Sequence, residues 1–173
     1  MASVQIFNDE ITTDDLPKIR LFLENQGIAF GTFTSNEVVK KLIVERSPSE
    51  EARKVMIEQF PSEIARFSQK SGYRADVVCF YPELSHLEFI LNKFGSIHYH
   101  FEHEFWYFID GAARFGFCGK EGTKFEVTVN AGEFLQVPEG IWQWFSLTPE
   151  KVMKAIRFFY TDHLVQPRMP VIL

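Results

Sequence analysis

The chain has 173 residues, of which 46% are hydrophobic and 24% are charged, and its net charge is −5. This length predicts a single domain over residues 1–173 that folds without a disulfide or a structural metal. The composition excludes disordered, collagen-like and disulfide-stapled proteins. The negative charge and the lack of a long basic run argue against nucleic acid and anionic membranes as partners.

The apolar runs and the cysteines indicate the cellular compartment of the protein. No run approaches the ~18–20 consecutive apolar residues of a transmembrane helix, and the acidic N-terminal segment lacks the pattern of a signal peptide. Cys79 and Cys118 lie in apolar runs without metal-type spacing, which is typical of free thiols in a reducing compartment. We therefore expect a cytoplasmic protein that is a monomer or a homodimer.

The first 92 residues predict a mainly helical section. Apolar residues recur there at intervals of three and four, and Gly27 and Gly72 mark two helix ends. Pro61 interrupts or kinks the second helix, because proline has no amide hydrogen to donate. The expected elements are helices over 14–25, 49–72 and 82–92, with a short strand over 75–81.

From residue 93 onward, short β-rich runs alternate with Gly, Asn, Asp and Pro. Such runs are typical of an antiparallel sandwich or a small barrel. We expect a mainly β fold of the α+β kind, in which the helical section precedes a barrel core over 93–165. The expected strands are 96–101, 104–109, 113–118, 124–129, 134–137, 142–147 and 153–160.

A cluster of histidines in the segment GSIHYHFEHEFWYFIDG carries the chemistry. His98 and His100 are two residues apart, so in a strand both imidazoles point to the same face. Glu104 follows four residues after His100, where the next strand can begin. Two imidazoles and a carboxylate on one face are suitable ligands for a first-row metal. A pair of purely structural histidines is the alternative.

The remaining histidines have less support. His103 has the opposite strand parity, so it is expected to face outward unless the turn brings it inward as a ligand. Glu102 shares the inward parity but lies at the expected turn. His86 and His163 are expected to be surface or packing residues.

Two segments resemble the motifs of the cupin superfamily. GSIHYHFEHEFWYFIDG resembles the first cupin motif, and the later run GEFLQVPEGIWQW resembles the second. A histidine normally stands in the second motif where this chain has Gln143. The resemblance implies a double-stranded β-helix barrel whose interior holds one metal.

Within the cupins, the chain is similar to the acireductone dioxygenases over most of its length. The likeness includes IRLFLENQGIAFGTF, which resembles the opening helix and strand of that family, and continues through ADVVCFYPE, the two motif segments and AIRFF. Three histidines and one glutamate bind iron(II) or nickel(II) in that family, which cleaves an enediol of methionine salvage with O2. The resemblance implies an iron(II)-dependent dioxygenase acting on a small molecule and O2, with nickel(II) or manganese(II) as other possible metals.

The resemblance also implies roles for individual residues. His98, His100 and Glu104 occupy three of the ligand positions, and Gln143 occupies the fourth. Trp106 stands where the family has an arginine that contacts the substrate. Three further positions match the substrate pocket of the family: Phe94, Phe145 and Arg157, the last fixing an anionic end of the substrate.

Gln143 and Trp106 depart from the pattern of the family, and both change the expected chemistry. A carboxamide oxygen is a harder and weaker donor than an imidazole, so a ligating Gln143 moves the site from nickel toward iron or manganese. If Gln143 does not ligate, two histidines and one carboxylate remain, as in many non-haem iron oxygenases. Alternatively, Gln143 bonds a core carbonyl in a barrel that has lost its metal.

Trp106 removes a cation and adds stacking surface, which favours a flatter or more apolar substrate than acireductone. A packing role in the barrel core is the alternative for Trp106. We expect an enzyme that cleaves a carbon–carbon bond of a small enediol or related chelating substrate with O2. A non-oxidative cupin remains open, either a small-ligand binding module or a metal-dependent isomerase or lyase.

Overall fold

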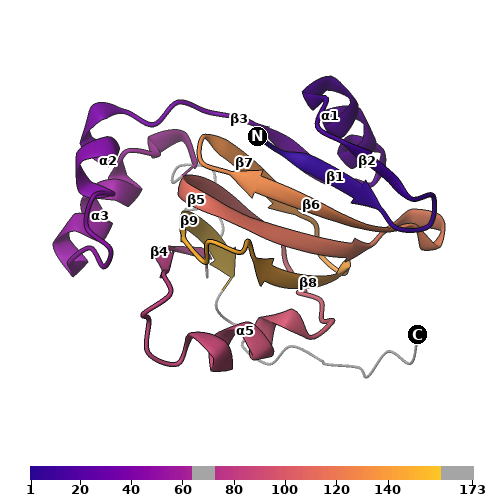
Figure 1. Cartoon of the computed structure of the whole chain (residues 1–173). Helices are drawn as coiled ribbons and strands as arrows, with labels where there is room; N and C mark the ends of the chain where they lie inside the picture. Colours follow the sequence, from indigo (N-terminus) through magenta and orange to yellow (C-terminus); the bar gives the residue numbers. More distant parts are fainter. Residues whose placement is uncertain (64–72, 161–173) are drawn as a thin grey trace.

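The computed structural model describes residues 1–63 and 73–160 of the chain. Within these residues, nine strands form one continuous antiparallel system that curls into a half-barrel, with a few helices around it (Figure 1). The expected mainly β fold with helices in its N-terminal part is therefore confirmed. No helix within these two ranges is long and apolar enough to cross a membrane.

The 15-residue strand β5 (Glu104–Cys118) joins the two sheets of the half-barrel. Its first half pairs with two strands of one sheet, and its second half pairs with two strands of the other. These partners are β7 (Glu133–Val137) and β9 (Met153–Tyr160) for the first half, and β6 (Lys124–Asn130) and β8 (Trp142–Leu147) for the second.

The expected break between strands 104–109 and 113–118 is wrong, because β5 bends there without ending. The pairing register with β9 shifts between Phe108 and Asp110, as in a β-bulge. Gly111 follows with φ +65°, and a Cβ at that position would collide with the carbonyl of Val152. The Asp-Gly pair, which is typical of a turn, therefore produces a bend that turns β5 from one sheet into the other.

Four strands come from the section that was expected to be mainly helical. β1 (Ser3–Ile6) pairs with β6, β2 (Ile11–Thr13) pairs with β1, and β3 (Ala29–Thr32) pairs with β7. β4 (Tyr73–Phe80) pairs with β9 and begins two residues before the expected strand 75–81. Residues 1–92 thus supply both outer strands of one sheet, β3 and β4, and the outer strand β2 at one edge of the other.

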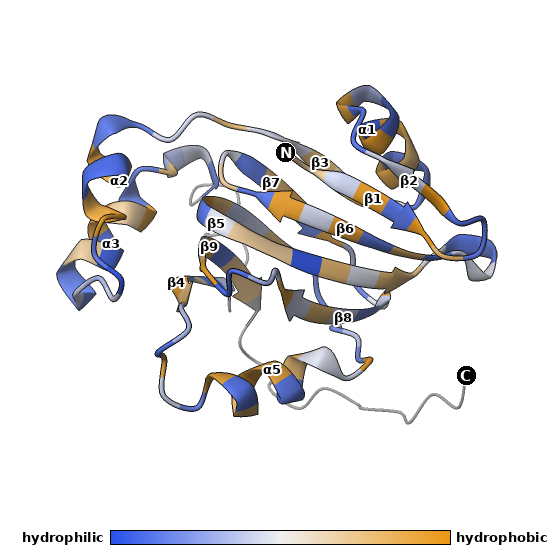
Figure 2. Ribbon diagram, in the orientation of Figure 1, coloured by the Kyte–Doolittle hydropathy of each residue, from blue (hydrophilic) through white to orange (hydrophobic). Residues whose placement is uncertain are grey.

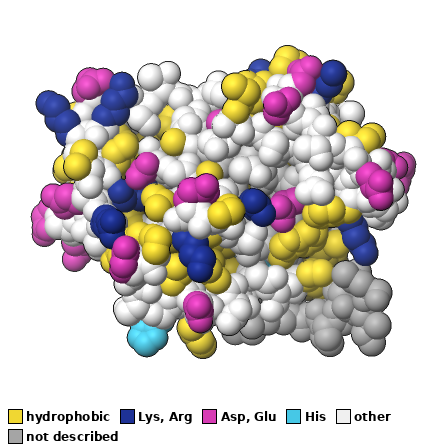
Figure 3. Space-filling view, in the orientation of Figure 1, with side chains coloured by type: hydrophobic (Ala, Val, Ile, Leu, Met, Phe, Trp, Pro, Cys, Tyr) yellow, Lys and Arg dark blue, Asp and Glu magenta, His cyan; other side chains and the backbone are white. Residues whose placement is uncertain are grey.

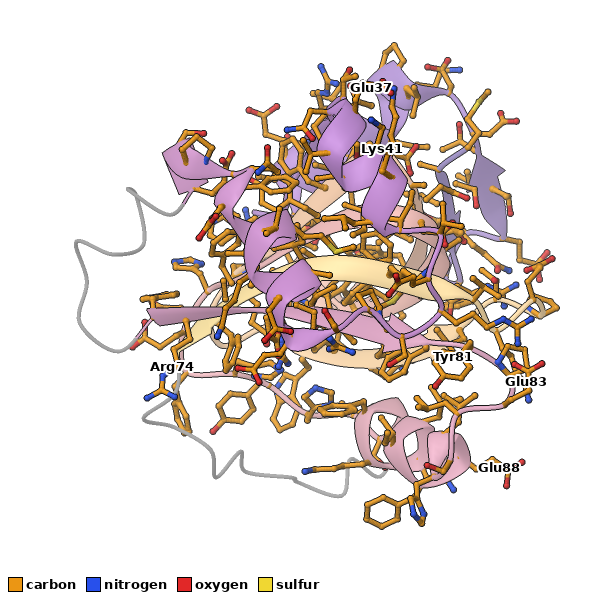
Figure 4. All side chains as sticks on the ribbon, turned by 90° about the vertical axis from the view of Figure 1, so that its left-hand side faces the viewer. Glu37, Lys41, Arg74, Tyr81, Glu83 and Glu88 are labelled. Carbon is orange, nitrogen blue, oxygen red and sulfur yellow. The ribbon has the colours of Figure 1, made fainter. Side chains whose placement is uncertain are left out.

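The helices differ from the sequence expectations mainly at their ends. α1 (Leu16–Asn25) is confirmed; the Asp15 side chain accepts a hydrogen bond from the Lys18 amide at 3.3 Å and caps its start. α2 (Glu37–Leu42), with Glu37 and Lys41 on the outer surface (Figure 4), was not expected. At six residues it is too short to produce a clear helical periodicity.

The helix expected over 49–72 ends early. α3 (Glu50–Glu58) stops before Phe60, because the residue before a proline, here Pro61, is disfavoured in a helix. Residues 61–63 resume a helical conformation, and residues 64–72 of the expected helix lie outside the described residues.

α5 (Leu87–Gly95) was expected over 82–92 but starts five residues later and ends three later. Turns occupy residues 82–86, and His86 has a left-handed conformation with φ 63°. Glu83 lies in this loop (Figure 4) and pairs with Arg46 at 2.6 Å. α5 lies beside β8 (Figure 1).

Residues 96–101, which were expected to form a strand, do not form one. Within this segment His98 alone forms a β-bridge, and its partner is Gln143 of β8. The segment instead connects α5 to β5, so it lies at the edge of the half-barrel rather than within a sheet.

Alternate side chains of β5 face two apolar cores. Trp106 and Phe108 pack inside the half-barrel, whereas Tyr107 and Ile109 pack on the outer face together with Met56 of α3. β6 alternates in the same way, with hydrophobic and polar residues in turn along the strand (Figure 2). The surface in Figure 3 carries both signs of charge, interspersed with hydrophobic side chains.

Candidate metal centre

A cavity of about 110 Å³ lies inside the half-barrel, and all of the expected site residues line it. The structure thus brings together side chains from α5, the segment before β5, and strands β5, β8 and β9. The lining comprises the expected residues Phe94, His98, His100, Glu104, Trp106, Gln143, Phe145 and Arg157, together with Val78, Phe80 and Phe115.

Sequence reasoning missed three apolar members of this wall. Val78 and Phe80 are two apart on β4, so both face the same side of the sheet. Phe115 has the same strand parity as Ala113 and Phe117, which are buried in the same core. Alternation along these strands was the signal that would have identified them.

The buried imidazole of His98 is oriented for ligation. Its Nδ1 lies 2.7 Å from the carbonyl oxygen of Ser96. A carbonyl can only accept a hydrogen bond, so Nδ1 carries the proton and donates it. In the neutral ring, the lone pair is then on Nε2. Metal-binding histidines typically donate a hydrogen bond from the ring nitrogen that does not bind the metal, as Nδ1 does here.

His100 and Glu104 contact each other directly. Nε2 of His100 lies 3.3 Å from Oε2 of Glu104; the Glu104 side chain is buried, and that of His100 is mostly buried. Burial lowers the pKa of His100, although the nearby Glu104 acts in the opposite direction. A lowered pKa favours the neutral imidazole, which is the form that binds a metal.

Gln143 lies beside His98 with its side chain almost fully buried. The amide of each residue donates to the carbonyl of the other, at 2.9 Å and 2.7 Å. Among residues 1–63 and 73–160, the carboxamide itself makes no hydrogen bond. The expected alternative, in which the side chain bonds a core carbonyl, therefore has no partner in this part of the chain.

The donor types fit a divalent first-row cation, but the donors are not arranged around a common point. Two imidazoles, a carboxylate and a carboxamide line one cavity, which matches the ligand preferences of such ions. Within the described residues, however, no group of three His, Cys, Asp or Glu side chains is placed to hold one ion. Nε2 of His100 and Oε2 of Glu104, 3.3 Å apart, are spaced as two neighbouring donors would be when each lies about 2.1 Å from one ion.

Arg157 reaches the cavity as a paired cation. Its Nε and one Nη donate to the two carboxylate oxygens of Asp76, at 3.2 Å and 2.9 Å. Asp76 of β4 is directly opposite Arg157 of β9 in the strand register. The other nitrogen, Nη1, lies 3.9 Å from Oε1 of Glu104. Asp76, which the sequence did not identify, thus holds the guanidinium in place.

Trp106 and Phe145 form the aromatic wall of the cavity. Their rings are 6.4 Å apart between centroids and nearly parallel, at 17°. The guanidinium of Arg157 lies 5.3 Å from the Trp106 ring, and the indole N–H has no hydrogen-bond partner among the described residues. Trp106 packs in the barrel core and also lines the cavity.

The other expected positions lie away from the cavity or remain undescribed. His103 does not line the cavity, and its carbonyl accepts a hydrogen bond from the Tyr73 hydroxyl at 3.4 Å. His86 is exposed, as expected, whereas His163 lies outside the described residues. Cys79 and Cys118 are half-buried free thiols, and burial raises the pKa of each.

The curled antiparallel sheets and the His- and Glu-lined interior define a cupin. More specifically, the chain belongs to the ARD/ARD' family, whose family model matches residues 4–166. The acireductone dioxygenase of Microcystis aeruginosa is 33% identical over 127 residues, which are 73% of this chain and 69% of the relative. The acireductone dioxygenase of Leptospira interrogans is 31% identical over 165 residues, covering 92% and 90% of the two chains.

A solved structure supports the same assignment. The acireductone dioxygenase from Bacillus anthracis, with a cadmium ion in its active centre, superposes with a TM-score of 0.84. It is 27% identical, and the match covers 96% of this chain and 98% of that one. The cupin fold expected from the two motifs is therefore confirmed.

Proposed function

We propose that this chain is a metal-dependent dioxygenase that cleaves a carbon–carbon bond of a small enediol or related chelating substrate with O2. The observation that carries the proposal is the cavity lined by His98, His100, Glu104 and Gln143. Membership of the ARD/ARD' family supports it independently. In such a reaction, both atoms of O2 end in the cleaved fragments.

The metal proposed is iron(II), with nickel(II) or manganese(II) as the other candidates. His98, His100 and Glu104 would hold it, and the carboxamide oxygen of Gln143 would be the fourth donor. Replacing an imidazole with this harder oxygen favours iron or manganese over nickel. When bound, the ion would supply Lewis-acid chemistry to a chelating substrate held in this cavity.

The side chains around the donors position the substrate and exclude water. Ser96 fixes the ring of His98 through the 2.7 Å hydrogen bond. Arg157 is the proposed catalytic residue that touches the substrate: Nη1, its one nitrogen not bonded to Asp76, donates to a substrate oxygen. Phe94, Trp106 and Phe145 supply apolar walls.

Acireductone itself is not the proposed substrate. Trp106 contributes a large apolar face and no charge to a wall where a second cation would help to hold a dianion. The nearly parallel ring of Phe145 extends this flat surface. A flatter, more apolar molecule fits the cavity better. The proposed partners are thus this small molecule and O2, in the cytoplasm.

Oxygen consumption tests the proposal. The iron(II)-reconstituted protein should consume O2 with a simple enediol or hydroxyketone and release two carbon fragments in step with that consumption. Turnover that persists without oxygen would indicate an isomerase or lyase instead.

A non-oxidative binding module is the second candidate. It is favoured by the lack of a converged group of three His, Cys, Asp or Glu side chains within the described residues. Ligand binding to a metal-loaded protein that consumes no O2 with any enediol would support this candidate and contradict the dioxygenase.

A further inference from the structure

We propose that the cavity binds its substrate as a planar monoanion, and that Asp76 sets this charge by balancing Arg157. This inference rests on the proposed function, because it concerns the substrate of the same metal centre. It adds the charge and shape of that substrate, and it adds a positioning residue that does not line the cavity.

The Asp76–Arg157 pair is built by the sheet. The two residues are opposite each other on β4 and β9, and the contact is bidentate, at 3.2 Å and 2.9 Å. Such fork-like pairs fix the plane of the guanidinium as well as its charge. The Arg157 side chain is four-fifths buried, whereas Asp76 is two-fifths exposed. Asp76 has the same strand parity as Val78 and Phe80, which line the cavity, so it holds Arg157 on the cavity face of the sheet, next to the lining but not part of it.

The net charge of the site follows from the charged side chains at the cavity and from Asp76. Among the described residues that line it, Glu104 and Arg157 are the charged side chains apart from the histidines, and imidazoles bind a metal in their neutral form. Asp76 brings the sum for the protein to one negative charge. A divalent cation changes the sum to one positive charge, which a monoanion neutralises.

A dianion would leave an excess negative charge in a largely apolar enclosure. Such a charge is costly because the surrounding side chains cannot solvate it. The nearly parallel rings of Trp106 and Phe145 favour a flat, conjugated ligand over a bulky one. The enolate of a conjugated hydroxyketone combines the single charge, the flat shape and two oxygens for chelation.

The test compares two flat chelators of different charge. Tropolonate is a planar hydroxyketone monoanion and oxalate is a planar dianion, and both bind metals through two oxygens. The protein is loaded with Zn(II), which is redox-inert, and the affinity for each probe is measured by isothermal titration calorimetry. The wild type should bind tropolonate at least about tenfold more tightly than oxalate, as expected for one unbalanced charge in a partly screened site.

Two variants of Asp76 give the matched comparison. Asp76→Asn leaves the positive charge of Arg157 unbalanced, so the affinity for oxalate relative to tropolonate should rise about tenfold. Asp76→Glu keeps the carboxylate, so it should retain the wild-type ratio. Thermal unfolding of each variant verifies that the fold is intact.

Each outcome has a defined consequence. Equal or tighter binding of oxalate by the zinc-loaded wild type would overturn the inference, and so would an unchanged ratio in Asp76→Asn. Zinc content measured on the same samples separates this failure from failure of the proposed function. A chain that binds no metal overturns both.

Discussion

His98 and Gln143 are joined by two backbone hydrogen bonds, so their side chains lie next to each other whatever residue occupies position 143. The bridge connects the segment before β5 with β8, and both residues line the cavity. A histidine at position 143 would therefore enter the same wall without any change in the backbone.

Gln143→His should raise the affinity for divalent metals and shift the preference toward nickel, because imidazole is the better donor for that ion. We expect a gain of about 10- to 100-fold, the range over which changes around a metal site alter its affinity. Competition titrations with a chromophoric chelator, using iron(II), manganese(II) and nickel(II), measure it. An unchanged nickel affinity would show that the side chain at position 143 does not reach the metal.

His98→Ala should abolish metal binding, because it removes a buried donor whose Nδ1 bond to the Ser96 carbonyl leaves the lone pair on Nε2. His86→Asn is the matched control: His86 is exposed, and asparagine tolerates its positive φ. Metal content and the unfolding midpoint are measured for both variants. Full metal content in a folded His98→Ala protein would contradict the assignment of the site.

The pair of changes Gln143→His and Trp106→Arg should create turnover of acireductone. The first adds an imidazole donor, and the second adds a cation to the wall near Glu104 and Arg157. Oxygen uptake with acireductone measures the gain, and each single variant is assayed alongside. A metal-loaded double variant without turnover would mean that other positions also separate this cavity from one that accepts acireductone.

Gly111→Ala should destabilise the fold by about 2–5 kcal/mol, since the new Cβ combines a positive φ with a collision against the Val152 carbonyl. Gly122→Ala is the control, because Gly122 also has a positive φ but a Cβ there meets no atom within 4 Å. That change should cost only about 1–2 kcal/mol. Urea unfolding measures both. Equal losses would show that the bend of β5 does not depend on the close contact.

The metal-ligand candidates could be predicted because they depend on local patterns. The spacing of His98, His100 and Glu104 survives the loss of the expected strand 96–101, since the segment remains extended enough to aim both imidazoles at the cavity. Gln143 was identified by its place in a second motif. Its contact with His98 depends on a bridge between distant segments.

Asp76 could not be predicted in the same way. It meets Arg157 because β4 and β9 pair across 81 positions of sequence, and neither residue lies in a motif that points to the other. The continuity of β5 could not be predicted either, because Asp110 and Gly111 are typical of a turn. The strand pairing on both sides of them shows that β5 bends there and continues. The short strands β1 and β2 offer too few residues for a clear alternation.

The metal content of the purified protein tests the central claim most directly. Inductively coupled plasma mass spectrometry should find about one iron, manganese or nickel per chain, and His98→Ala should carry none. A wild-type chain that stays metal-free after anaerobic reconstitution with iron(II) would contradict the account.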